Sequence, residues 1–115
     1  MSHRRPNPIS AQRQAQAPVF AALGDPTRLA LVAKLSAGSP YSIAQLTTGS
    51  RITRQAITKH LRVLERAGIV RCVRAGRESR FQLDPEPIAE LKQYLDFVSE
   101  QWDQALGRLK AFVED

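Results

Sequence analysis

The sequence predicts a mainly α-helical domain with one small β-hairpin, in the order helix, helix, helix, helix, strand, strand, helix. Apolar residues recur at helical spacing over most of the chain. Glycines, prolines and capping residues divide this pattern into separate helices. Only after Gly68 does the pattern change to short β-favouring runs. With 115 residues, of which 43% are hydrophobic, the chain can bury one core, so a single domain is expected.

The charge of the chain is unevenly distributed. Residues 1–83 hold 14 Arg or Lys against 3 acids, a net charge of +11, whereas residues 84–115 hold 3 against 8, a net charge of −5. This division predicts one surface for a polyanion and another for a different task. No stretch approaches the roughly 20 apolar residues of a membrane span, and the N-terminus has no apolar signal core. We therefore expect no membrane partner and a cytoplasmic protein.

The N-terminal part predicts an arm followed by a helix. Residues 1–9 combine two arginines with two prolines and are too polar to pack, so a flexible basic arm is expected. Contact of this arm with DNA phosphates is the alternative to simple disorder. Apolar spacing from Ser10 to Leu23 predicts a helix, in which Pro18 marks either the true start or a bend. The folded domain is expected over residues 10–84.

The second helix has clear boundary signals. Gly24 can close the preceding helix, Asp25 can cap the next one, and Pro26 suits a first helical turn. The helix is expected to run to about Ala37 and to be a central core element. Its expected inward residues are Leu29, Leu31, Val32 and Leu35.

A short third helix is expected after a turn at Gly38-Ser39-Pro40. Ser42 can cap it, and it should end near Thr48, before a turn at Gly49-Ser50-Arg51. Its expected inward residues are Ile43, Ala44 and Leu46.

The fourth helix, residues 53–67, has an apolar stripe and a basic outer face. Ile57, Leu61 and Leu64 follow the spacing i, i+4, i+7 and should face the core. The outer face carries side chains that reach phosphates and base edges, and a bare helix fits the DNA major groove. A short helix, a glycine-containing turn and such a helix form a helix-turn-helix. The alternative is an ordinary surface helix with solvated charges.

A β-hairpin is expected next, from residues 69–74 and 79–83. Both runs are rich in β-favouring residues and are joined by a turn that contains Gly76. Arg74, Arg77 and Arg80 cluster at or near its tip. Beside a helix-turn-helix such a wing can reach phosphates or the minor groove. The alternative is that these charges protect an edge strand from aggregation.

The order of elements and their sequences resemble the ArsR-type winged-helix transcriptional regulators. The resemblance is carried by FAALGDPTRLALVAKL (20–35) and ITRQAITKHLRVLERAGIVRCVRAGRESRFQLDP (52–85). It implies a homodimeric DNA-binding repressor that releases its operator when an effector binds. It also implies that His60 lies near DNA or at a helix-packing interface. Together, the helix, the wing and the resemblance predict DNA contacts by Thr53, Arg54, Gln55, Thr58, Lys59, His60, Arg62, Arg74, Arg77 and Arg80.

The chain departs from the metal-sensing members of that family. The third helix, SIAQLTT, contains no Cys, His or acid, and the last helix contains no His. Because soft and borderline metals need thiolates or imidazoles, we predict no metal site and no cofactor. Cys72 is expected to be a small, half-buried filler, with a redox role as the alternative. An unidentified small-molecule effector is left open.

The last helix, expected over residues 85–115, carries a heptad seam. Apolar residues from Ile88 to Phe112 repeat at alternating steps of 3 and 4. About 27 residues of helix extend ~40 Å, which is longer than a small domain is wide. In a monomer, part of the apolar seam would therefore be exposed to solvent. The alternative is a helix that folds back over its own core. We predict a homodimer interface formed by Leu91, Leu95, Val98, Trp102 and Leu109.

These features favour a sequence-specific DNA-binding regulator whose partners are double-stranded DNA and a second copy of itself. The alternative is a winged-helix module that docks an acidic protein without reading DNA. We do not expect an enzyme. The sequence offers no constellation of nucleophile, base and oxyanion site, and no glycine-rich phosphate loop.

Overall fold

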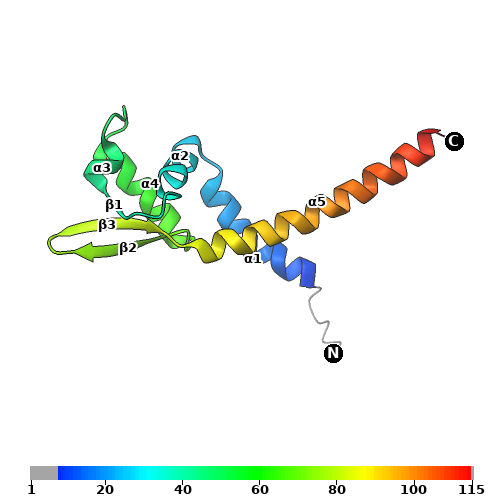
Figure 1. Ribbon diagram of the computed structural model, residues 1–115, viewed down its shortest axis with the longest axis horizontal. Helices are drawn as coiled ribbons and strands as arrows, with labels where there is room; N and C mark the ends of the chain where they lie inside the picture. Colours follow the sequence, from blue (N-terminus) through cyan, green and yellow to red (C-terminus); the bar gives the residue numbers. More distant parts are fainter. Residues whose placement is uncertain (1–7, 115) are drawn as a thin grey trace.

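The computed structural model describes residues 8–114 of the chain. Its helices are α1 (Pro8–Leu23), α2 (Pro26–Leu35), α3 (Ile43–Thr47), α4 (Arg54–Arg66) and α5 (Pro85–Glu114), and its strands are β1 (Tyr41–Ser42), β2 (Val70–Ala75) and β3 (Glu78–Leu83). The first four helices and the sheet form a head, from which the far half of α5 projects as a single rod (Figure 1). The predicted N-terminal arm lies outside the described residues, except that α1 already begins at Pro8.

Side-chain caps define where three of the helices begin. The Asp25 carboxylate accepts a hydrogen bond of 3.0 Å from the Arg28 backbone N–H at the start of α2. At α3, Ser42 and Gln45 form a reciprocal capping box. Thr53 caps α4 by accepting from the Ala56 N–H at 3.2 Å. These caps satisfy N–H groups that a helix leaves without partners in its first turn, so they fix the boundaries that the sequence predicts.

The hydrophobic core lies where α2, α3 and α4 pack against the sheet. Its centre is formed by six side chains that are at most 1% exposed: Leu35, Leu46, Leu61, Leu64, Ile69 and Phe81. Leu91 of α5 and two residues of α1, Val19 and Ala22, close one side of it. The amphipathic stripe predicted for α4 is confirmed, since Ile57, Leu61 and Leu64 are all buried.

Two sequence-based expectations about the helices are wrong, and one of the two alternatives for Pro18 is excluded. Leu29 is 53% exposed, because Leu31 and Leu35 define the buried face of α2 and Leu29 lies about 200° around the helix from Leu31. Ala44 is exposed, and Leu46 is the buried residue of α3. Pro18 lies inside α1 and does not mark its start.

The sheet has three strands in the order β1-β3-β2, all antiparallel. The predicted hairpin is confirmed, with a two-residue turn in which Gly76 has φ of 66°, a conformation that favours glycine. The two-residue β1 was not predicted. Cys72 pairs with Phe81 but is exposed and not half-buried, because β2 is an edge strand and the core covers β3.

Helix α5 leaves the head after its first half. Its start is fixed by Asp84, whose carboxylate accepts from the Glu86 N–H at 3.1 Å. It then packs along α1, where the Phe20 and Tyr94 rings meet edge to face with centroids 6.1 Å apart. None of the described helices combines the length and the apolar character that a membrane crossing requires.

Candidate nucleic-acid interface

The first two turns of α4 present the side chains with the most freedom to meet a ligand. Arg54, Gln55 and Lys59 are exposed, and within residues 8–114 none of them has a side-chain hydrogen bond or ion pair. Two other predicted residues there are partly engaged. The Thr53 hydroxyl accepts the capping bond, and the half-buried Thr58 donates its hydroxyl to the Arg54 carbonyl at 2.7 Å. The N-terminal half of the helix therefore carries two free cations and a free amide.

Arg62, on the same helix, is held in place by its neighbours. Its guanidinium donates to the Glu65 carboxylate at 2.8 Å and lies 5.9 Å from the centroid of the Phe81 ring. The hydrogen bond to Glu65 raises the pKa of Arg62 above its ordinary value. Because Phe81 belongs to β3, this arginine connects α4 to the sheet that carries the wing. It is less available to DNA than Arg54 or Lys59.

His60 is turned toward the start of α2. Its Nδ1 lies 3.2 Å from the Arg28 guanidinium and 3.8 Å from the Asp25 carboxylate. Arg28 also donates to the carbonyl of Ala22 in α1. The two short motifs GDPTR and KHL, far apart in the sequence, therefore meet in one polar cluster that joins α1, α2 and α4. An arginine can only donate, so this contact requires that Nδ1 accept and carry no proton.

Asp25 is the acidic member of this cluster. Its pKa is lowered, chiefly because the carboxylate accepts the Arg28 backbone N–H, and the charge of Arg28 acts in the same direction. The cluster thus combines the helix cap of α2 with the contact between α2 and α4. Asp25, Arg28 and His60 therefore hold α4 against the start of α2.

The hairpin tip carries two free arginines and one paired arginine. Arg74 and Arg77 are exposed and form no ion pair within the described residues. Arg80 is paired with the Glu78 carboxylate, with its Nη2 at 3.2 Å. Arg77 lies in the two-residue turn between β2 and β3, at the far end of the wing (Figure 1).

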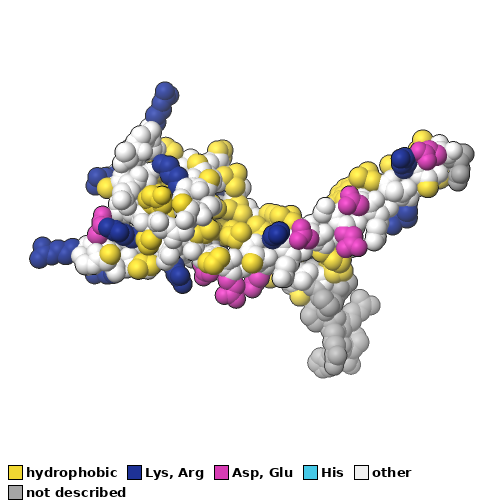
Figure 2. Space-filling model, in the orientation of Figure 1, with side chains coloured by type: hydrophobic (Ala, Val, Ile, Leu, Met, Phe, Trp, Pro, Cys, Tyr) yellow, Lys and Arg dark blue, Asp and Glu magenta, His cyan; other side chains and the backbone are white. Residues whose placement is uncertain are grey.

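The charge asymmetry predicted from the sequence is visible on the surface. Lys and Arg side chains extend from the head and from the wing tip, while Asp and Glu side chains lie mainly along α5 (Figure 2). Arg51 is an exposed cation of the head that was not among the predicted contacts. Arg51 lies in the turn between α3 and α4, just before Thr53, the cap of α4. Its position in a helix-turn-helix turn was the signal that could have identified it.

The predicted dimer seam divides into a covered part and an uncovered part. Leu91 is 7% exposed within its own chain, and Val98 is half-buried. Leu95, Trp102 and Leu109 are about half exposed or more, at 45%, 64% and 58%. Three further large apolar side chains are also exposed at the end of α5: Leu106, Phe112 and Val113. A continuous apolar stretch of the projecting helix therefore lacks a cover within the described chain.

Within the described range no three His, Cys, Asp or Glu side chains come close enough together to hold a metal ion. The exposed polar groups of α4 and the wing are amide and basic side chains. This arrangement suits hydrogen bonding and charge pairing with a polyanion.

Comparison with known proteins agrees with this geometry. A family model for a helix-turn-helix domain matches residues 23–73. The chain is 38% identical over 85 residues to the HTH-type transcriptional regulator Rv2034 of Mycobacterium tuberculosis, covering 74% of this chain and 76% of that protein. It is 33% identical to the solved structure of an ArsR-like transcriptional regulator from Rhodococcus sp. RHA1, with a TM-score of 0.77 and coverage of 90% and 94%.

The chain belongs to the ArsR-type winged helix-turn-helix family. As a member of this family it is a transcriptional regulator with a helix-turn-helix DNA-binding fold. In that fold α3 and α4 are the two helices of the motif, and β2 and β3 form the wing. A further relative is the uncharacterised HTH-type regulator YuzN of Bacillus subtilis, 39% identical over 79 residues, which cover 64% of this chain and 86% of YuzN. The family is one of DNA-binding regulators and is not an enzyme class.

Proposed function

We propose that the protein is a homodimeric repressor that binds a pseudo-palindromic operator in double-stranded DNA through α4 and the wing. One observation carries the proposal. Arg54, Gln55 and Lys59 are exposed and unpaired on the N-terminal half of α4, the half that meets base edges in helix-turn-helix proteins. The wing adds two unpaired arginines, Arg74 and Arg77, on a hairpin that extends from the same head.

The contacts differ in what they contribute. Gln55 can pair with an adenine edge through its amide, and Arg54 can pair with guanine O6 and N7, so these residues specify sequence. Lys59, Arg74 and Arg77 are suited to phosphates, which position the protein without reading bases. His60, Arg62 and Arg80 are already engaged with other side chains, so we assign them supporting roles at the rim.

The dimer is proposed from the uncovered part of α5. Trp102 and Leu109 are 64% and 58% exposed, and a second α5 is the complementary surface that a heptad seam favours. A winged helix-turn-helix DNA-binding domain from Mycobacterium bovis with a TM-score of 0.66 and 20% identity is homodimeric, which supports this arrangement. The transcriptional repressor BigR from Xylella fastidiosa has the same fold, with a TM-score of 0.63 and 24% identity, which is consistent with repression.

The proposal is tested by selecting genomic DNA fragments with the purified protein and measuring their affinity against shuffled sequences. We expect the selected fragments to bind at least about 10³-fold more tightly than shuffled DNA at about 0.15 M salt. The logarithm of affinity should also fall linearly with the logarithm of salt concentration. Equal affinity for selected and shuffled DNA would contradict the proposal and favour a module that docks an acidic protein.

A further inference from the structure

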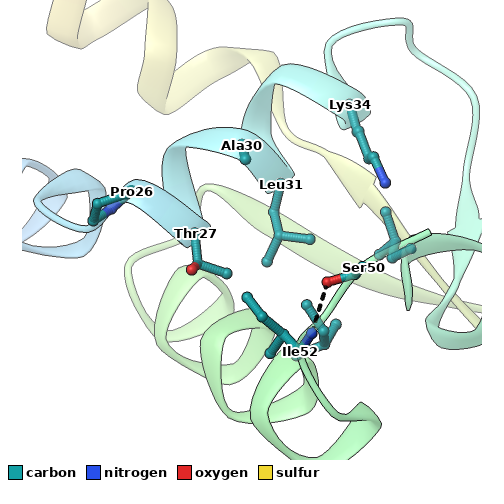
Figure 3. A pocket seen from close by; sticks show the side chains of 9 residues that line it. Pro26, Thr27, Ala30, Leu31, Lys34, Ser50 and Ile52 are labelled. Atoms are coloured by element: carbon teal, nitrogen blue, oxygen red, sulfur yellow. Dashed lines mark hydrogen bonds between the residues drawn. The ribbon is translucent and has the colours of Figure 1, made fainter. Parts of the chain in front are cut away.

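A cavity of about 250 Å³ lies between α2 and the helix-turn-helix unit. Its apolar wall is formed by Leu31, Leu46 and Ile57, which are at most 3% exposed and so hold fixed positions. Ile52, from the turn before α4, closes the side opposite α2 (Figure 3). The cavity therefore has a firm apolar interior built from three helices and one turn.

The rim of the cavity is polar and carries one cation. Lys34 extends from the last turn of α2 on the side of the cavity that Ser50 borders (Figure 3). Lys34 forms no salt bridge within residues 8–114, although carboxylates elsewhere in that range are paired. The Ser50 hydroxyl accepts from the Ile52 N–H at 3.1 Å, so its own hydrogen is free to be donated to a ligand. An unpaired ammonium and a hydroxyl hydrogen on the same side of the pocket are complementary to a carboxylate.

The volume indicates the size of group that the pocket, which is open to solvent, can hold. An apolar cavity of about 150 Å³ holds one benzene molecule, so this cavity has room for one ring and a short polar group, roughly ten non-hydrogen atoms. We propose that the cavity binds a small apolar carboxylic acid of about the size of a monoaromatic acid. The ring lies among Leu31, Leu46 and Ile57, and the carboxylate lies beside Lys34.

Binding here has a regulatory consequence that rests on the proposed DNA-binding function. Ser50 and Ile52 belong to the turn that sets the start of α4, and Ile57 belongs to α4 itself. An acid bound between this turn and α2 favours one position of the turn. It therefore changes operator affinity to the extent that the position of the turn differs between the free and the DNA-bound protein. The coupling is reciprocal, so operator DNA changes the affinity for the acid by the same factor.

The binding step can be tested on the full chain without DNA. Amide resonances of ¹⁵N-labelled protein are followed while sodium benzoate is added, with benzamide as the neutral probe of the same shape. We expect saturable shifts at residues that line the cavity, including Leu31, Ser50 and Ile52, and benzoate binding at least tenfold tighter than benzamide. Shifts scattered over the basic surface, or none that saturate, would overturn the proposal.

Matched variants distinguish the contribution of the Lys34 charge to binding from the contribution of the apolar cavity. Lys34→Met keeps the length of the side chain and removes its charge, so benzoate affinity should fall at least tenfold, about 1.4 kcal/mol, while benzamide is unaffected. Lys92→Met, on the exposed surface of α5, should leave both probes unchanged. Ala30→Leu is expected to weaken both probes, since Ala30 lines the cavity from an exposed helical position.

Undiminished benzoate binding by Lys34→Met would overturn the proposed carboxylate contact. Because these measurements contain no DNA, their failure is distinguishable from a failure of the proposed DNA-binding function. The regulatory step is then read from operator affinity with and without benzoate, in the wild type and in Lys34→Met. If benzoate changes the operator affinity of the wild type but not that of Lys34→Met, the regulatory step is supported. If benzoate changes the operator affinity of neither protein, the regulatory step is contradicted.

Discussion

At the scale of single residues, α4 separates side chains that are free from side chains that are already held. Arg54, Gln55 and Lys59 have no side-chain partner within the described residues, whereas His60 contacts Arg28 and Arg62 contacts Glu65. A free side chain can reorganise around a base or a phosphate. A held one must first give up its partner, so its net contribution to binding is smaller.

Gln55→Ala should weaken base discrimination without abolishing DNA binding. The amide of Gln55 can make a bidentate contact to one adenine, and loss of such a contact costs about 1–3 kcal/mol of preference at one position per half-site. The measurement is the affinity of the variant for a panel of single-base operator variants. A discrimination pattern identical to that of the wild type would show that Gln55 does not read a base.

Arg77→Ala should weaken binding to every sequence alike. Arg77 lies in the wing turn and is suited to a phosphate, so its loss removes one released counterion and reduces the salt slope by about one unit. The check is the slope of log affinity against log salt for operator and shuffled DNA. Arg108→Ala, on α5, is the matched control and should leave the slope unchanged. A sequence-selective loss would assign base reading to the wing.

Asp25→Ala should lower stability at neutral pH, and this difference should shrink in acid. The folded-state pKa of Asp25 lies below its ordinary value of 3.8, so its contribution is present above about that pH and is lost as pH falls through the folded value. Urea unfolding of both proteins from about pH 7 to about pH 3 measures it. Asp96→Ala, an exposed site on α5, is the control and should show little difference at any pH. An Asp25→Ala difference that persists in acid would contradict the role of the charged cap.

Local signals in the sequence predicted the caps Asp25 and Ser42, because a cap acts within three residues of its own position. They did not predict the partners of His60 and Arg62. Arg28 is 32 positions from His60, and Phe81 lies on a strand that follows α4, so both contacts depend on how distant elements pack. Whether the predicted DNA-contact residues bind DNA stays a prediction.

At the scale of elements, strong periodicity was a reliable guide and short segments were not. The apolar stripe of α4 and the β-hairpin were recovered, since each extends over several residues. The two-residue β1 has no period to detect, and it forms because Tyr41 and Ser42 meet Phe81 and Arg80 across the sheet. The exposure of Leu29 shows the same limit, because an apolar residue alone does not reveal which face of a ten-residue helix is covered.

Trp102→Asp should produce a folded monomer with weak operator binding. Trp102 is 64% exposed in one chain, so the charge costs little in the monomer, but it is costly in a buried helix interface. Analytical ultracentrifugation gives the oligomeric state, and circular dichroism shows whether the chain is folded. Gln104→Asp, an exposed site on the same helix, is the control. A folded monomer that still binds its operator tightly would contradict the role assigned to α5.

At the scale of the whole molecule, basic and acidic side chains are separated along the long axis of the chain. The basic head and wing lie at one end, and the acidic α5 with its uncovered apolar stretch extends to the other, across a length of 64 Å (Figure 2). This separation allows two chains to associate through α5 while both heads remain free to contact one duplex. Two heads provide the number of contacts that a single small module lacks for specific binding.

The most direct test of this account is a hydroxyl-radical footprint on a selected operator, combined with the stoichiometry of the complex. Two chains related by a two-fold axis should protect two half-sites whose centres lie about 10 base pairs, or a multiple of one helical turn, apart on one face of the duplex. The complex should contain two chains per operator. A single protected half-site with one chain bound, or no protection on a fragment the protein selects, would contradict the account.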